Sequence, residues 1–222
     1  MKRNFVAALL CLAASIPALA QNVDKRLADS AAVLNDIVAK SEISNTAWSK
    51  TKCVLIYPSV KKVGVGIGVS YGRGVLVCRT GTNMNGKWGA PIMYSLDTGS
   101  LGAQLGSSAT DYVLLIISQN GADKVLSGKL KLGAGASAVA GPTGATANEL
   151  SDSSIDILSY SRAKGLFAGA SLGSASMDAD DKANKVLYGK EMSAAEILRQ
   201  GTTPPAAQPL IAALQQASAK GM

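Results

Sequence analysis

The sequence predicts an α+β protein that is mainly β, a compact and tightly coiled antiparallel β barrel or sandwich with peripheral helices. Between about residues 53 and 173, small and apolar residues alternate with a period of two, most strictly in residues 64–71. Glycine weakens an ordinary strand, so repeated glycine on one face indicates close approach of another backbone or sharp coiling. Residues 112–117 form a continuous apolar run, typical of a strand buried on both faces. Helical periodicity appears on both sides of this region.

Two cysteines lie in the predicted β region, in apolar runs at residues 53–57 and 74–79. We interpret these runs as the first and third strands of a meander. Alternate strands of a sheet lie nearly 10 Å apart, about twice the strand spacing, which is too far for a disulfide bond. The sequence therefore favours buried thiols at Cys53 and Cys78, and only a different strand order would bring them together.

Predicted helices flank the β region. Residues 22–50 place apolar side chains at helical spacing and so predict an amphipathic helix. This helix covers the core, or, as the alternative, it also touches a membrane through its basic residues. Ser193 and Glu196 form a capping box that begins a short helix. After a break at residues 201–205, residues 206–219 predict an alanine-rich helix that is only loosely attached to the core.

The N-terminal segment has the three parts of a secretion signal. Lys2 and Arg3 are followed by an apolar run over residues 5–16 and by small residues before Gln21. The apolar run is shorter than the roughly 20 residues that a membrane-spanning helix needs. We therefore expect a signal peptide over residues 1–20, a domain with its amphipathic helix over residues 21–190, and a helical C-terminal tail over residues 191–222.

Several motifs resemble catalytic sites but lack the partners that the chemistry requires. Ser70 and Ser171 lie in G-x-S-x-G sequences, where the serine needs a histidine base, and the chain contains no histidine. Ser161 and Lys164 match S-x-x-K without the companion S-D-N and K-T-G elements. The acidic residues 178–181 lack the glycine and glutamate of an EF-hand loop. We therefore expect no catalytic residue, no metal site and no cofactor.

Basic residues crowd the turns and ends of the predicted strands, and the formal net charge is +7. Such a charge suits an anionic surface, either lipid or nucleic acid, and the secretion signal disfavours nucleic acid. Each Lys or Arg near an anionic membrane contributes about 1 kcal/mol, and an amphipathic aromatic such as Trp88 suits the same surface. The alternative is scattered charge that serves solubility alone. The basic residues in question are Lys50, Lys52, Lys61, Lys62, Arg73, Arg79, Lys87, Arg162 and Lys164.

The segment DILSYSRAKGLFAG at residues 156–169 is similar to the signature of the SYLF family, whose members are lipid-binding domains, also called actin-binding in fungi. Residues 57–68 resemble the first strand and glycine run of that family. The resemblance covers about residues 28–189. Further matches follow in family order at Trp88 with Pro91, Gly99 to Gly106 with Gln104, Thr110-Asp111, Gly141-Pro142-Thr143-Gly144, and Asn184 with Tyr188-Gly189.

The SYLF resemblance implies a compact β-rich domain with no known catalytic centre. It implies binding of anionic phospholipid, phosphoinositides in eukaryotic members, through basic residues and an amphipathic N-terminal helix. Together with the basic residues at the turns and strand ends, the resemblance leads to a set of candidate lipid-binding positions. These are Lys25, Arg26, Lys61, Lys62, Arg73, Lys87, Trp88, Arg162 and Lys164.

We therefore expect an exported, non-catalytic protein of the periplasm or envelope of a Gram-negative bacterium. Its expected ligand is an anionic envelope lipid, such as phosphatidylglycerol, cardiolipin or a lipopolysaccharide phosphate. The alternative is a protein-interaction or structural module of the periplasm or outer membrane without lipid affinity, with an envelope protein as its partner. We expect neither nucleic acid nor actin as a partner.

Overall fold

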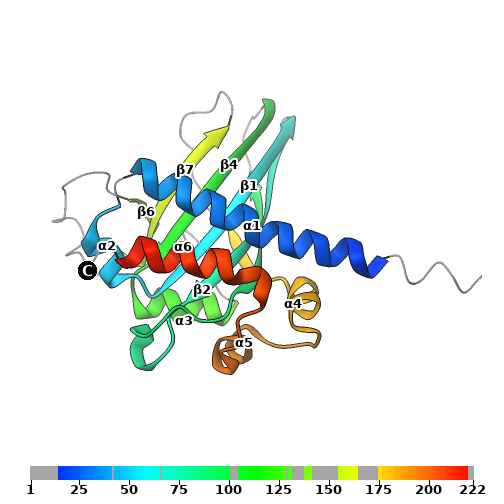
Figure 1. Ribbon diagram of the computed structural model, residues 1–222. Coiled ribbons are helices and arrows are strands. Elements are labelled where there is room, and N and C mark those ends of the chain that lie inside the picture. The colour runs from blue at the N-terminus through cyan, green and yellow to red at the C-terminus, as the bar shows by residue number, and fades with distance from the viewer. Residues whose placement is uncertain are drawn as a thin grey trace, which may run out of the picture.

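The computed structural model describes residues 15–41, 43–65, 67–100, 105–128, 130–131, 138–141, 155–164 and 175–219. Strands of these residues form one eight-stranded sheet in the order β5-β8-β3-β2-β1-β4-β7-β6, antiparallel except where β6 pairs with β7 (Figure 1). The strands are β1 (Cys53–Val65), β2 (Ile67–Cys78), β3 (Ile92–Ser100), β4 (Leu105–Ile116), β5 (Leu130–Lys131), β6 (Ala138–Ala140), β7 (Ile157–Lys164) and β8 (Ser176–Ala179). The helices are α1 (Ser15–Ser41), α2 (Asn45–Lys50), α3 (Gln119–Leu126), α4 (Asp181–Tyr188), α5 (Ala194–Gln200) and α6 (Gln208–Ala219), with short 3-10 turns η1 (Thr82–Met84) and η3 (Pro205–Ala207).

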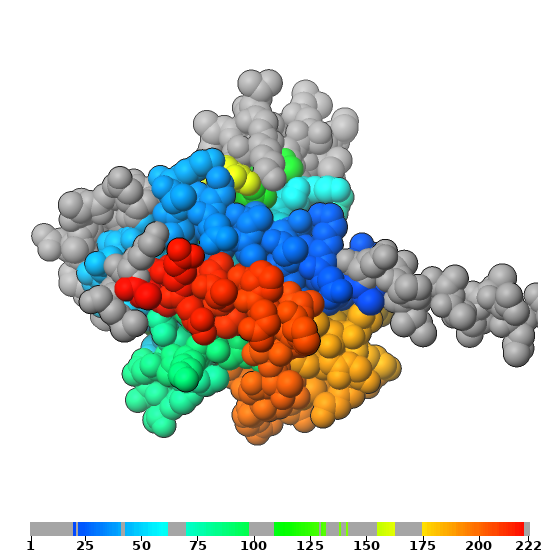
Figure 2. Space-filling model, viewed as in Figure 1, coloured from blue at the N-terminus to red at the C-terminus, as the bar shows by residue number. Residues whose placement is uncertain are grey.

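Alternation along the strands gives the sheet two apolar faces, and helices cover both. Val54 and Ile56 of β1 point to the side of α1 and α6, which we call the α1 face. Leu55 and Tyr57 point to the opposite side, the α3 face, where α3 and α5 pack. Figure 1 shows α1 and α6 lying side by side across the sheet, and Figure 2 shows them as the outer layer of the α1 face. The predicted α+β fold, with an antiparallel β core and peripheral helices, is confirmed.

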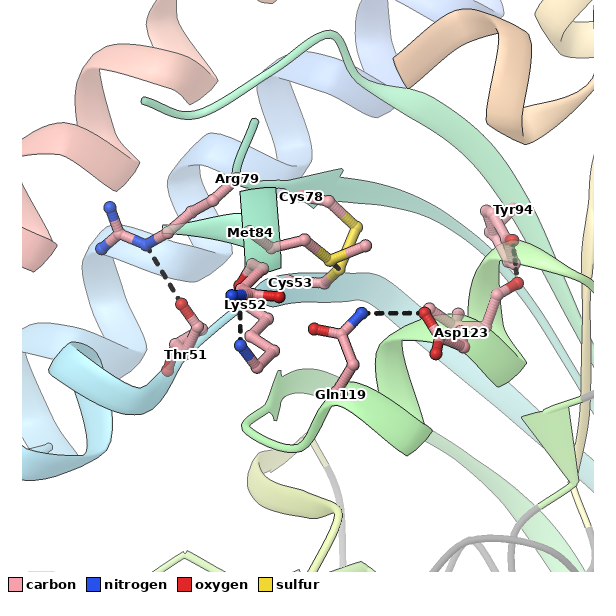
Figure 3. The surroundings of a disulfide bond; sticks show 11 residues. Thr51, Lys52, Cys53, Cys78, Arg79, Met84, Tyr94, Gln119 and Asp123 are labelled. Carbon is pink, nitrogen blue, oxygen red and sulfur yellow. Dashed lines mark hydrogen bonds between the residues drawn. A yellow bond between two sulfur atoms is a disulfide. The ribbon is translucent and has the colours of Figure 1, made fainter. Parts of the chain in front are cut away.

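The centre of the sheet is a long hairpin of β1 and β2. Cys53 and Cys78 are cross-strand partners at its open end and form a disulfide bond, beside which Met84 lies in Figure 3. The prediction of two separate thiols is wrong because it placed a further strand between the two cysteine runs. Residues 64–65 and 67–71 instead form the far ends of β1 and β2 themselves, so the two runs pair directly.

A β-bulge in β1 reverses the alternation of its side chains. Between Tyr57 and Val60, β1 has one residue more than β4, and its register against β2 shifts at the same place. Ser59 has a left-handed φ of 56°, and its N–H donates a 2.8 Å hydrogen bond to Asp111 Oδ1. Val60 therefore packs with Tyr57 on the α3 face, and Lys61 lies on the α1 face.

Asp111 also joins the sheet to α1. Its side chain is fully buried, and Oδ2 accepts hydrogen bonds from Arg162 Nε at 3.1 Å and from Arg162 Nη2 at 2.5 Å. Arg162 lies directly opposite Asp111 on β7 and forms a second ion pair with Asp36 of α1. A buried charge is tolerated where it is both paired and hydrogen-bonded. One guanidinium thus neutralises the buried carboxylate and links the sheet to the helix that covers it.

The last helix is part of the core. Leu210 and Leu214 of α6 are fully buried in the apolar cluster that also contains the inner side of α1. Near the end of α6, Ser218 Oγ accepts a 3.2 Å hydrogen bond from Trp88 Nε1. The expectation that residues 206–219 are loosely attached is therefore wrong. Alanine gives a weak apolar signal in the sequence, yet its small side chain allows a helix to approach its neighbour closely, and α6 packs along α1 in this way.

The predicted helix over residues 22–50 is present as two helices. α1 ends at Ser41, and α2 begins after Ser44, whose side chain accepts a hydrogen bond from the backbone N–H of Ala47. Buried residues such as Leu27 and Leu34 place α1 over the core, as the first of the two interpretations expected. None of the helices in the described part of the chain combines the length and apolarity needed to cross a membrane.

We predict that Leu214→Ala lowers the free energy of unfolding by about 2–5 kcal/mol, because it removes a fully buried side chain from the α1–α6 cluster. The matched control is Gln215→Ala, which alters the exposed neighbour on the same helix and is expected to change stability by about 0.5 kcal/mol or less. Urea denaturation followed by circular dichroism measures both variants. Equal effects would contradict the packing of α6 as part of the core.

Asp111→Asn tests the link between the bulge, β7 and α1. Asparagine keeps a side-chain oxygen for the Ser59 N–H but removes the charge that pairs with Arg162, so we expect a loss of about 3 kcal/mol in the free energy of unfolding. The control Asp123→Asn changes an exposed carboxylate of α3 that accepts a hydrogen bond from Gln119 and is expected to cost about 0.5 kcal/mol or less. A variant at Asp111 as stable as this control would show that the ion pair is not structural.

Candidate functional site

An open groove with a volume of about 630 Å³ lies on the α1 face of the sheet. Its walls come from the first half of α1, from β1 and β2 beyond the bulge, and from the start of α4. These segments are far apart in the sequence, and their charged side chains are mostly basic. The charged lining residues are Lys25, Arg26 and Asp29 of α1, Lys61 of β1, Arg73 of β2, Asp180 before α4 and Lys182 of α4.

The register of the central hairpin places the sheet residues of the groove. Lys61 lies opposite Tyr71, and Arg73 follows Tyr71 by two residues and so shares its face. The next residue on the other face is Gly74, where a Cβ would lie 2.4 Å from the carbonyl oxygen of Ile56. Glycine is therefore required there for β2 to approach β1 beside the groove residue Arg73.

Asp180 lies at the centre of the charges in the groove. Its Oδ2 is 3.0 Å from Arg26 Nη1 and 3.8 Å from Arg73 Nε. The side chains of Arg26 and Asp180 are only 13% and 16% exposed, whereas that of Arg73 is 57% exposed. Asp180 also caps α4, because its Oδ1 accepts a hydrogen bond from the backbone N–H of Ala183. Three of the four elements around the groove, α1, β2 and α4, thus meet at one carboxylate.

The rim of the groove is exposed. Lys25 pairs with Asp29 one turn later on α1, and both side chains reach solvent. Lys61 and Lys182 are exposed as well. Tyr71 is 47% exposed, and every other large hydrophobic side chain of the described residues is more enclosed. A phenol ring among cations has the apolar body and polar tip that suit the boundary between a membrane and water.

The structure brings together four of the residues singled out in the sequence, Lys25, Arg26, Lys61 and Arg73. Arg162 does not line this groove and is held by Asp111 and Asp36. The side chains of Lys62 and Lys164 lie outside the described part of the structure.

Lys87 and Trp88 lie in the segment between β2 and β3. Lys87 is exposed, but Trp88 is only 6% exposed and belongs to the core of the α1 face. The guanidinium of Arg79 lies 4.4 Å from the centre of its indole ring, and Ser218 accepts its N–H. The expectation that Trp88 presents its ring at the surface is therefore wrong, because α6 covers it from a position distant in the sequence.

Sequence analysis missed Tyr71, Asp180 and Lys182 as groove residues. Tyr71 ends the alternating run, where the pattern alone does not show which face it takes. Asp180 belongs to the acidic stretch that was compared with an EF-hand loop, although an aspartate immediately before a helical pattern is also an N-cap signal. That signal was available and would have placed Asp180 and Lys182 at the start of a helix.

The groove has the chemistry of a binding site for an anion. Its cations can donate hydrogen bonds to phosphate or carboxylate oxygens. Among the residues that the structure describes, no group of His, Cys, Asp or Glu could hold a metal ion. Burial raises the pKa of Tyr57 well above its ordinary value and that of Tyr160 to about 12.

Comparison with known proteins shows related sequences in fungi and animals. A family model described as "Ysc84: Las17-binding protein actin regulator" matches residues 97–217, a range that ends within α6. "SH3 domain-containing protein PJ696.02" of Schizosaccharomyces pombe is 35% identical over 163 residues, which are 70% of this chain and 37% of that protein. "Protein YSC84" of Saccharomyces cerevisiae is 31% identical over 163 residues, 71% of this chain and 34% of that protein. "SH3 domain-containing YSC84-like protein 1" of Homo sapiens is 29% identical over 151 residues, 67% of this chain and 43% of that protein.

This chain therefore spans well under half the length of these curated relatives. None of the three names refers to an enzyme. No solved structure is significantly similar to this chain. The family match covers more than half of the 222 residues and agrees with the resemblance found in the sequence, so the chain belongs to the Ysc84 family of SYLF domains.

Proposed function

We propose that this protein binds anionic phospholipid at a membrane surface through the basic groove and catalyses no reaction. The observation that carries the proposal is the convergence of five basic side chains from α1, β1, β2 and α4 on one open groove. Asp29 and Asp180 offset only part of the repulsion among these five cations, so the groove keeps an excess of positive charge that a bound anion can offset. Tyr71, exposed beside these cations, adds a ring that can enter the interface.

A phosphate head group fits the donors of the groove. Arginine binds phosphate oxygens in a bidentate manner, and lysine adds point charge from the rim. With about 1 kcal/mol for each cation near an anionic surface, the rim lysines and Arg73 supply a useful but salt-sensitive attraction. The proposed lipids are phosphatidylglycerol, cardiolipin or a lipopolysaccharide phosphate.

We also propose that the protein is exported to the periplasm or envelope of a Gram-negative bacterium. Two observations support this: the three-part N-terminal segment and the disulfide bond between Cys53 and Cys78. Disulfide bonds persist in oxidising compartments and are rare where thiols are kept reduced. In that location the lipids named above are the anionic surfaces that the groove would meet.

A second candidate function is a protein-interaction module without lipid affinity. The description of the family as Las17-binding and the name "LAS seventeen-binding protein 3" of a Saccharomyces cerevisiae relative favour it. This chain covers only 35% of that relative, so the named partner belongs to a much longer protein. For this chain we propose an acidic segment of an envelope protein, rather than actin, as the partner in this second case.

Charge reversal in the groove tests the first candidate. We expect the wild-type protein to float with vesicles of phosphatidylglycerol and phosphatidylcholine, not with phosphatidylcholine alone, and to dissociate as salt is raised. Lys61→Glu should weaken binding about tenfold, because it replaces attraction by repulsion at the groove. The matched control is Lys131→Glu, an equal charge change at an exposed residue of β5, far from β1 in the strand order.

The control is expected to change binding about twofold or less, through net charge alone. Equal loss in both variants would contradict the groove as the binding site. Equal binding to charged and neutral vesicles would contradict the electrostatic mechanism. Absence of vesicle binding together with cross-linking to one defined envelope protein would favour the second candidate.

The export proposal has its own test. Protein isolated from the envelope fraction should begin at Gln21 and contain oxidised Cys53 and Cys78, both of which mass spectrometry measures. Expression of residues 21–222 behind a start codon should keep the protein in the cytoplasm with both thiols reduced. An uncleaved chain with reduced cysteines in normally grown cells would contradict export.

A further inference from the structure

Asp180 lies where a bound head group would need to make its strongest contacts. We infer that Asp180 is an internal competitor for the head-group site: it occupies Arg26 and Arg73, weakens the binding of every anion, and makes the groove select the more highly charged ones. The inference rests on the proposed function, since it concerns the same groove. The inference adds that one residue of the groove lowers its affinity for anions. The convergence of cations alone does not suggest such a residue.

The geometry makes the competition direct. Asp180 Oδ2 approaches Arg26 at 3.0 Å and Arg73 at 3.8 Å, so one carboxylate oxygen serves both guanidinium groups. A phosphate oxygen binds guanidinium N–H groups as a carboxylate oxygen does. Arg26 is largely enclosed and its Nη1 donates a hydrogen bond to Asp180 Oδ2, so a phosphate that takes over this hydrogen bond must displace the carboxylate. Arg73 is more than half exposed and held less closely, so it is the first of the two that a ligand can take over.

The charge of the ligand decides whether the exchange is favourable. A phosphate diester carries the same single charge as Asp180, so replacing the carboxylate by a diester gains little Coulomb energy. The exchange also leaves a mostly enclosed carboxylate without its partners, which is costly. A phosphate monoester carries about −1.5 to −2 charges at neutral pH and so exceeds the carboxylate it replaces. The groove should therefore prefer monoester head groups.

A purely structural role for Asp180 makes the opposite prediction. If the ion pairs only hold α1, β2 and α4 together, then removing the charge should loosen the groove and weaken binding. If Asp180 competes with the ligand, then removing the charge should strengthen binding. Asp180→Asn separates the two roles well, because asparagine is as good an N-cap as aspartate and keeps the bond from Ala183.

The experiment measures vesicle binding at one ionic strength for the wild type and for Asp180→Asn. One set of phosphatidylcholine vesicles contains phosphatidic acid, a monoester, and the other contains the same molar fraction of phosphatidylglycerol, a diester. We expect the wild type to prefer phosphatidic acid. Asp180→Asn should bind both kinds of vesicle at least about tenfold more tightly than the wild type. The gain should be larger for phosphatidylglycerol, so the preference for phosphatidic acid becomes smaller.

The matched control is Asp29→Asn, which removes the same charge from the exposed rim of the same groove. It should raise binding about twofold, because its partner Lys25 is 70% exposed and already open to a ligand, so mainly the overall charge changes. A second variant, Asp180→Asn combined with Arg73→Ala, should lose most of the gain, since Arg73 is one of the groups released. Thermal unfolding of each variant verifies that binding is measured on folded protein.

The outcomes separate this inference from the proposed function. If the wild type binds anionic vesicles but Asp180→Asn gains no more than Asp29→Asn, then only the inference is overturned. If the wild type fails to bind and Asp180→Asn binds, then competition by Asp180 is supported in its strongest form. If neither protein binds any anionic vesicle, then both the inference and the proposed function are wrong.

Discussion

The hydrogen bond from the Ser59 N–H to Asp111 holds the extra residue of β1, and the placement of the groove depends on it. Before the bulge, the even-numbered residues Val54 and Ile56 of β1 face α1, and after it the odd-numbered Lys61 does. Without that change of phase Lys61 would point to the α3 face, away from α1 and α4. The other oxygen of Asp111 binds Arg162, which in turn reaches α1, so one buried carboxylate sets both the direction of β1 and the position of the helix above it.

The basic residues of this protein fall into two groups with different roles. Arg162 and Arg26 are held by carboxylates, and Arg79 lies over the Trp88 ring with its Nε donating to the Thr51 carbonyl oxygen. Burial lowers the pKa of Arg79, a sign of the desolvation that comes with a position within the fold. Lys61 and Lys182, in contrast, extend into solvent at the groove. A positive net charge therefore overstates the number of cations that can meet a ligand.

Much of the fold could be predicted from the sequence, because binary patterns report which residues are buried. Alternation identified the β region, helical spacing identified the flanking helices, and the SYLF signature identified the family. Patterns do not report strand order, and the disulfide was missed because the glycine-rich run was counted as a separate strand instead of the far half of one hairpin. A change of phase is signalled only indirectly: Pro58 inside a strand is typical of an edge strand or a bulge, and the local pattern does not show which of the two applies.

The site was predictable in composition but not in geometry. Lys25, Arg26, Lys61 and Arg73 were found because cations at helix faces and strand ends stand out, and the fold brings them to one groove. The environment of Trp88 depends on a contact with Ser218 that spans most of the chain, which no local pattern contains. Asp180 was not predicted for a different reason, because its acidic stretch was compared only with a calcium-binding loop. Its role as a partner of Arg26 and Arg73 arises only where α1, β2 and α4 meet in the fold.

The packing of α6 along α1 has a consequence for the order of events during synthesis. α1 is made before α6, so the apolar side that the two helices share stays uncovered until α6 has left the ribosome. Contacts between segments so distant in the sequence form late and slow the folding of a chain. The nascent protein thus carries an exposed apolar helix until α6 has been made, a state in which chaperones or the export machinery can hold it.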